Sequence, residues 1–183
     1  MESQKQITFS NLKPNISDAI KESCPTSDAV IYKIADEVSH IKTVTVEPGV
    51  EIAQGLLMII DTTIRASVCL GCDLSIIVQG ILAGAFRSRS IQLEAHKTIR
   101  LLIEEIIGAV FIHKGDIKKT VDGLLAGIVV IAKEHKLNEQ EALIVATENI
   151  LIYSKAKNSR FAEDIKSVIP QEYGGLKSIK LGD

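Results

Sequence analysis

The segment Leu74–Phe86, with the sequence LSIIVQGILAGAF, decides the fold class of this chain. None of its residues is charged, and it is shorter than the roughly 20 apolar residues that a membrane-spanning helix needs. It is apolar around nearly its whole circumference, which is typical of a helix buried inside a bundle or between subunits. We therefore interpret it as the central helix of an all-α protein that does not enter a membrane.

The same pattern returns later in the chain. A shift of 43 residues lays residues 50–86 over residues 93–129, so that GILAGA at 80–85 falls on GLLAGI at 123–128. Positions that keep the same residue include Glu51 and Glu94, Ala66 and Ala109, Asp73 and Asp116, Gly80 and Gly123, and Gly84 and Gly127. A weaker third copy starts at Glu141. The pattern predicts a duplicated helical hairpin over residues 50–135, and the alternative is that apolar helices share Ala, Leu and Ile by chance.

Single polar and glycine residues punctuate these apolar segments. Gly71 and Gly115 are expected to take the left-handed conformation that ends a helix. Asp73 and Asp116 are expected to cap the helices that follow. The predicted helices span residues 50–70, 74–87, 91–113, 117–135, 139–157 and 160–168, after an earlier one near 29–41. Residues 1–24 are interpreted as an N-terminal arm and residues 25–183 as a single helical domain.

Glycine inside a helix costs about 1 kcal/mol relative to alanine, so repeated glycines need an offsetting gain. Gly80 and Gly84, like Gly123 and Gly127, are four residues apart and share one helical face. We expect these glycines, which lack a side chain, to let two helix backbones approach closely, either within one chain or between copies of it.

The overall composition is that of a soluble globular chain. Hydrophobic residues make up 46% and the formal net charge is −2, so the basic balance expected of a nucleic-acid-binding protein is missing. The N-terminus shows no secretory or transit signal, and a cytoplasmic location is expected. The odd count of three cysteines argues against a disulfide framework.

Cys69 and Cys72 form the only short motif with chemical content, a CxxC. Such a pair can be a redox dithiol or half of a zinc site, and the alternative is two buried structural cysteines beside a helix break. The motif resembles that of the alkylhydroperoxidase and carboxymuconolactone decarboxylase family. Its redox members carry His four residues after the second Cys, where this chain has Ile76.

Asp61, Glu104 and Glu105 interrupt strongly apolar segments, and Asp61 and Glu104 occupy equivalent repeat positions. Together they could bind a cation. The alternative is local ion pairing four residues apart, between Asp61 and Arg65 and between Arg100 and Glu104.

Further isolated features have an ordinary surface interpretation. Glu37 and His40 form a single Glu-x-x-His, whereas di-iron bundles repeat that motif. Exposed helical histidines are expected at His96, His113 and His135, and a solvated basic face at Arg87, Arg89, Lys97 and Arg100.

The sequence thus favours a non-enzymatic interaction or scaffold protein that self-associates as a homo-oligomer. A small thiol-dependent oxidoreductase that uses Cys69 and Cys72 is the first alternative, and a cation-binding bundle that uses Asp61 and Glu104 is the second. No cofactor is predicted, and no small-molecule ligand is identified.

Overall fold

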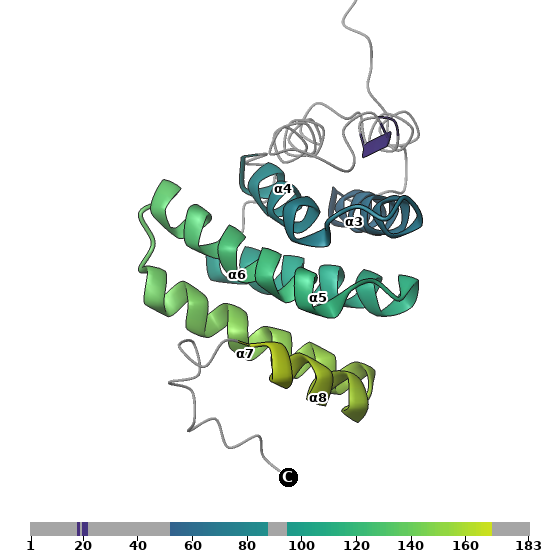
Figure 1. Ribbon diagram of the computed structural model, residues 1–183. Coiled ribbons are helices and arrows are strands. Elements are labelled where there is room, and N and C mark those ends of the chain that lie inside the picture. The colour runs from purple at the N-terminus through teal and green to yellow at the C-terminus, as the bar shows by residue number, and fades with distance from the viewer. Residues whose placement is uncertain (1–17, 19, 22–51, 88–94, 170–183) are drawn as a thin grey trace, which may run out of the picture.

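The computed structural model describes Asp18, Ile20, Lys21 and residues 52–87 and 95–169 (Figure 1). Every secondary-structure element in these residues is helical, as the sequence predicts. The helices are α3 (Ile52–Cys69), α4 (Leu74–Arg87), α5 (Ala95–His113), α6 (Ile117–Glu134), α7 (Glu139–Lys157) and α8 (Ser159–Val168). The expected helix near 29–41, residues 88–94 and the C-terminal tail from 170 lie outside the described residues.

The six helices form three layers of two helices each (Figure 1). The first layer holds α3 and α4, the second α5 and α6, and the third α7 and α8. Between layers, α4 packs on α6, while α5 packs on both α3 and α7. Helices α4 and α6 begin 43 residues apart, so the spacing seen in the sequence is also the spacing between the first two layers.

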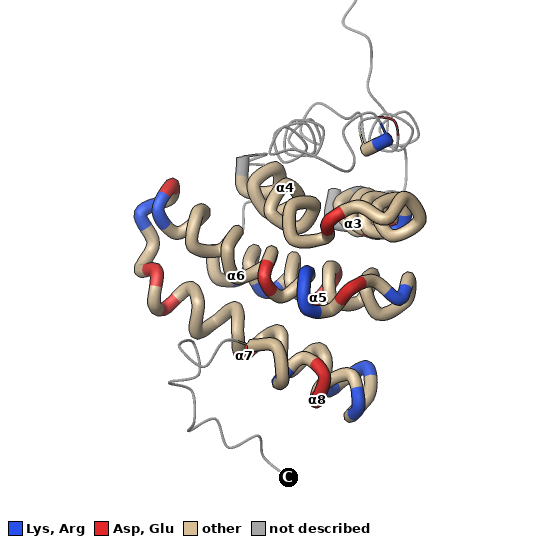
Figure 2. Tube along the Cα trace, viewed as in Figure 1, with Lys and Arg blue, Asp and Glu red and all other residues tan. Residues whose placement is uncertain are grey.

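One continuous apolar core runs through all three layers, and isoleucine and leucine dominate it. Its members include Ile64 of α3, Ile81 of α4 and Ile106 of α5. Ile20, which lies within the segment predicted to be an arm, is fully buried in the same core. Residues 74–86 of α4 carry no charge (Figure 2), and most of them are buried.

Side chains at the helix starts satisfy the backbone amides that the first turn leaves without a partner. Oδ1 of Asp73 accepts hydrogen bonds from the amide and hydroxyl of Ser75, at 2.9 and 2.8 Å. Asp116 accepts from the amide of Lys119 at 3.0 Å. Asn138 and Asn158 cap α7 and α8 in the same way. The caps predicted at Asp73, Asp116 and Asn138 are therefore confirmed.

The glycines at the helix ends divide into two cases. Gly71 has φ +68°, so the predicted left-handed residue after α3 is confirmed. After α5, however, Lys114 takes that conformation with φ +55°, and the expectation for Gly115 is wrong. A Cβ at Gly115 would lie 2.8 Å from Cδ1 of Leu74, so close packing explains glycine there.

None of the described helices combines the length and the apolar character that crossing a membrane requires.

Candidate functional site

Among the glycines whose neighbouring atoms are described, Gly123 makes the closest helix contact, between α4 and α6. A Cβ at Gly123 would be 2.5 Å from the backbone oxygen of Ser75 and 2.7 Å from its Cα. One turn later, a Cβ at Gly127 would be 2.6 Å from Cδ1 of Leu82. The two helices run parallel, because Gly123 lies against Ser75 and Gly127 against Gln79. The glycines of α6 thus remove the side-chain layer that usually separates two helices.

The N-termini of α4 and α6 are joined by a polar contact. Nζ of Lys119 lies 3.4 Å from Oδ2 of Asp73, while the amide of Lys119 donates to Asp116. Partial burial tends to raise the pKa of Asp73, but the hydrogen bonds from Ser75 and the charge of Lys119 outweigh it. The pKa of Asp73 consequently lies below its ordinary value of 3.8. This contact orients the two helix starts and leaves the carboxylate charged near neutral pH.

A second contact between layers joins α3 to the end of α5. Nε2 of His113 lies 2.7 Å from Oδ1 of Asp61, and the ring donates because a carboxylate only accepts. His113 occupies the last turn of α5, and its side chain is only 19% exposed, so the expectation of an exposed histidine there is wrong. Asp61 is therefore paired across layers, and the local ion pair expected with Arg65 does not form among the described residues.

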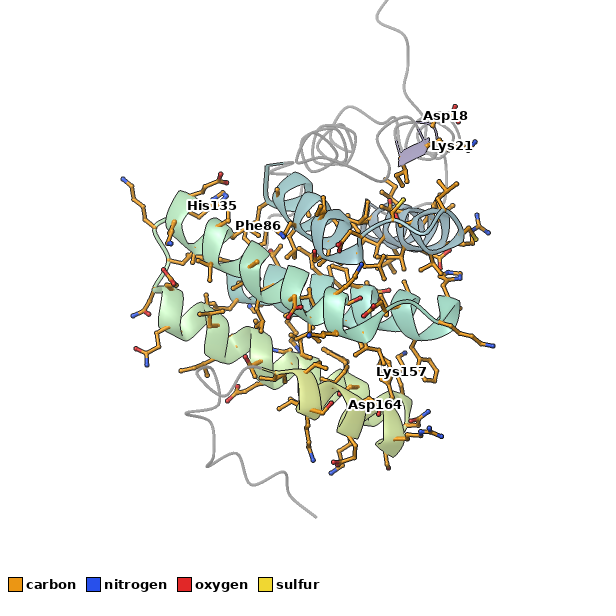
Figure 3. All side chains as sticks on the ribbon, in the orientation of Figure 1. Asp18, Lys21, Phe86, His135, Lys157 and Asp164 are labelled. Carbon is orange, nitrogen blue, oxygen red and sulfur yellow. The ribbon has the colours of Figure 1, made fainter. Side chains whose placement is uncertain are left out.

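The equivalent region between α5 and α7 is also polar. Nε of Arg100 donates to the hydroxyl of Tyr153 at 3.0 Å. Burial raises the pKa of Glu105, the neighbouring Glu104 raises it further, and Lys157 opposes them. Arg100 attracts Glu104 electrostatically, but among the described ion pairs none joins the two side chains. Figure 3 shows Lys157 at the end of α7. The side chain of Lys157 approaches Gly108 of α5.

No described contact joins the two carboxylates, Asp61 and Glu104, that are predicted as a cation site. Asp61 faces His113, and Glu104 lies nine residues earlier on α5, about 13 Å along the helix axis. Within residues 52–87 and 95–169, no three His, Cys, Asp or Glu side chains form a group that could hold a metal ion.

The two cysteines of the CxxC motif have different states. Cys69 is exposed and has a free thiol, whereas Cys72 is buried and disulfide-bonded. They are therefore not bonded to each other. The odd cysteine count argued against a disulfide framework, but it allows one disulfide beside one free thiol. Cys24, the third cysteine, lies outside the described residues.

The remaining candidates show no shared site. The ring of His135, the residue that caps the end of α6, lies 5.4 Å from that of Phe86 (Figure 3). His96 is half-buried at the start of α5. Glu37, His40 and Arg89 lie outside the described residues.

The sequence reasoning missed the outward face of α7. Ile144 and Ile152 are 37% and 48% exposed on this helix, while Ala142, Ala146 and Ile150 face the core. Apolar residues on both sides of one helix were the available signal, because a helix that only covers a core has one apolar face. The sequence pattern over this segment predicts only a weaker third repeat copy.

Comparison of the chain with known protein families and with curated proteins finds no match.

Proposed function

We propose that this chain is a non-enzymatic protein of stacked helical hairpins that functions by self-association, as a scaffold or interaction module. The single observation that carries the proposal is the double-sided apolar character of α7 in the third layer. This helix buries one face against α5 and α6 and presents Ile144 and Ile152 on another. Removal of such side chains from water favours association by roughly 25 cal/mol per Å² of apolar area.

The layered arrangement supports the proposal. In stacked-hairpin proteins each unit uses its faces to contact the next unit, and terminal units need a cover. We interpret the 43-residue spacing as a duplicated hairpin, α3–α4 and α5–α6, to which α7–α8 is added as a diverged third unit. A terminal unit with exposed isoleucines is suited to a contact with another molecule.

The glycine contact supports a scaffold in a different way. Because Gly123 places the backbones of α4 and α6 in contact, small changes in their relative position meet strong repulsion. We infer that Gly80, Gly84, Gly123 and Gly127 make the centre of the protein rigid, so that its outer helices are presented in a fixed geometry.

The test is the mass of the purified full-length chain in solution across a wide range of concentrations. Sedimentation velocity and light scattering should show a mass that rises above the 19.9 kDa of one chain as concentration increases. A mass of one chain at every concentration would contradict self-association.

A thiol-dependent reaction is the second candidate, and the exposed free thiol of Cys69 supports it. An exposed free thiol at Cys69 stands three residues before a disulfide-bonded Cys72. Titration of the native protein with a thiol reagent, before and after mild reduction, tests this candidate. Reversible gain of thiols without loss of helix content supports it, and a disulfide that is reduced only on unfolding contradicts it.

A further inference from the structure

The outward face of α7 carries a regular stripe of five side chains. Glu141, Ile144, Glu148, Ile152 and Lys155 follow one another at spacings of three or four residues, which keeps them on one side of the helix. All are exposed except Glu148, which is half-buried. The stripe extends for about 21 Å along the helix. The half-buried Val145 and Leu151 flank it and add apolar area.

The stripe is symmetric about its central residue. Ile144 and Ile152 lie four residues before and after Glu148, and Glu141 and Lys155 lie seven residues before and after it. If two copies of α7 lie antiparallel with their Glu148 residues opposite, each Ile144 meets the other copy's Ile152. Each Glu141 then meets a Lys155 of opposite charge. A contact of this kind is isologous, the usual form in a two-fold dimer.

We propose that α7 forms the contact helix of an antiparallel, two-fold dimer of this chain, centred on Glu148. This inference rests on the proposed function of self-association and names its surface and its partner. The antiparallel arrangement is favoured by charge. It forms two favourable Glu–Lys pairs and one unfavourable Glu–Glu contact. A parallel pairing in register instead opposes like charges at positions 141, 148 and 155.

The spacing of the stripe suits a helix–helix seam. Its residues recur every three or four positions, close to the 3.5-residue period that keeps a seam facing a partner helix. The isoleucines provide the apolar contact, and the charges at its two ends specify the orientation.

Charge exchange between copies tests the orientation directly. Glu141→Lys opposes Lys to Lys at both ends of the dimer, and Lys155→Glu opposes Glu to Glu. Each variant alone should therefore dissociate about tenfold more readily than the unchanged chain. An equimolar mixture of the two should recover the original affinity, because in the mixed dimer both end contacts join opposite charges.

Sedimentation velocity with one variant fluorescently labelled follows the mixed dimer. Recovery in the mixture supports the antiparallel contact. Single variants that associate like the unchanged chain, or a mixture no stronger than either variant alone, would overturn it.

A matched pair of isoleucine variants tests the location. Ile152→Asp introduces a charge into the proposed seam and should abolish the dimer. Ile112→Asp makes the same chemical change at the end of α5, where Ile112 is 65% exposed, and should leave the dimer intact. Circular dichroism of both variants monitors folding. Equal loss of association in both variants, or in neither, would overturn the assignment to α7.

Substitution of the central residue, Glu148, should change the affinity of the dimer in the opposite direction. Glu148→Gln removes the like-charge contact and should tighten the dimer, whereas a structural role of Glu148 within one chain would not produce tighter association.

The outcomes separate this inference from the proposed function. An unchanged chain that stays monomeric at all concentrations contradicts self-association as well as the dimer. A chain that associates regardless of every change on α7 contradicts only the antiparallel α7 contact.

Discussion

The contact between α4 and α6 and the contact between α5 and α7 join successive layers in two different ways. At Gly123, a single added carbon would collide with the backbone of Ser75 at 2.5 Å. At Gly108 on α5, the same carbon would meet only the flexible end of Lys157, at 3.7 Å. Both glycines are internal to a helix, yet only Gly123 is required by packing. The difference shows that the atoms of the neighbouring layer decide whether a position inside a helix requires glycine.

Alanine substitution at these two glycines should give the largest difference in the free energy of unfolding. Gly123→Ala gains helix propensity but forces backbone against backbone, and should lower the free energy of unfolding by about 2 kcal/mol or more. Gly108→Ala should raise it by up to about 1 kcal/mol, because only propensity changes. Chemical denaturation of both variants measures the difference. Equal effects would show that α4 and α6 are not in backbone contact.

The cap that joins the same two helices should have the next largest effect. Asp73→Ala removes the hydrogen bonds to Ser75 and the charge opposite Lys119, and should cost about 1 kcal/mol near neutral pH. Asp73→Asn is the matched control, because Asn retains the cap and loses only the charge.

The pH dependence of this variant has a defined sign. The folded-state pKa of Asp73 lies below 3.8, so its ionised form adds stability above that pH. This contribution is lost as the pH falls through the folded-state pKa. The difference in unfolding free energy between the unchanged chain and Asp73→Asn should therefore disappear in strong acid. A difference that stays constant with pH would contradict the charge contribution.

The pair between α3 and α5 should contribute less, because about half of the Asp61 side chain is exposed to solvent. A double-mutant cycle with Asp61→Asn and His113→Ala should give a coupling energy of about 0.5 kcal/mol, consistent with a partly exposed pair. A parallel cycle with Arg65→Ala should give none. A coupling energy with Arg65 and none with His113 would contradict this pairing and support the local ion pair expected from the sequence.

Glu105 should show the smallest effect, and it has the opposite sign to Asp73. Its pKa is raised above 4.5, so the charged form disfavours folding. Glu105→Gln should raise the free energy of unfolding by a few tenths of a kcal/mol at neutral pH, because solvent screens this half-exposed group. The gain should vanish below pH 4.5, where the unchanged carboxyl is protonated in both states. A loss of stability would indicate that attraction to Lys157 outweighs burial.

Helix positions were predictable because their signals are local. The start of α4 agrees with the predicted position 74, and the bounds of α7 agree with 139–157, since Asp73 and Asn138 mark the starts within the chain itself. The partner of Asp61 could not be predicted, because His113 is 52 residues away and reaches it only when α5 stacks on α3. Arg65, four residues from Asp61, was the only partner that sequence spacing could suggest.

The outward stripe of α7 was likewise predictable in part. Periodicity places Ile144 and Ile152 on one side of a helix, but it does not say which side faces solvent. That choice depends on which face α5, α6 and α8 cover.

The sequence by itself determined the all-α class and the starts of α4, α6 and α7, because hydrophobic period and helix caps act over a few residues. The tertiary structure decided which glycines are needed for packing, which carboxylate meets which cation, and which isoleucines remain outside. These depend on atoms that are distant in the chain and come within contact distance only when the layers stack.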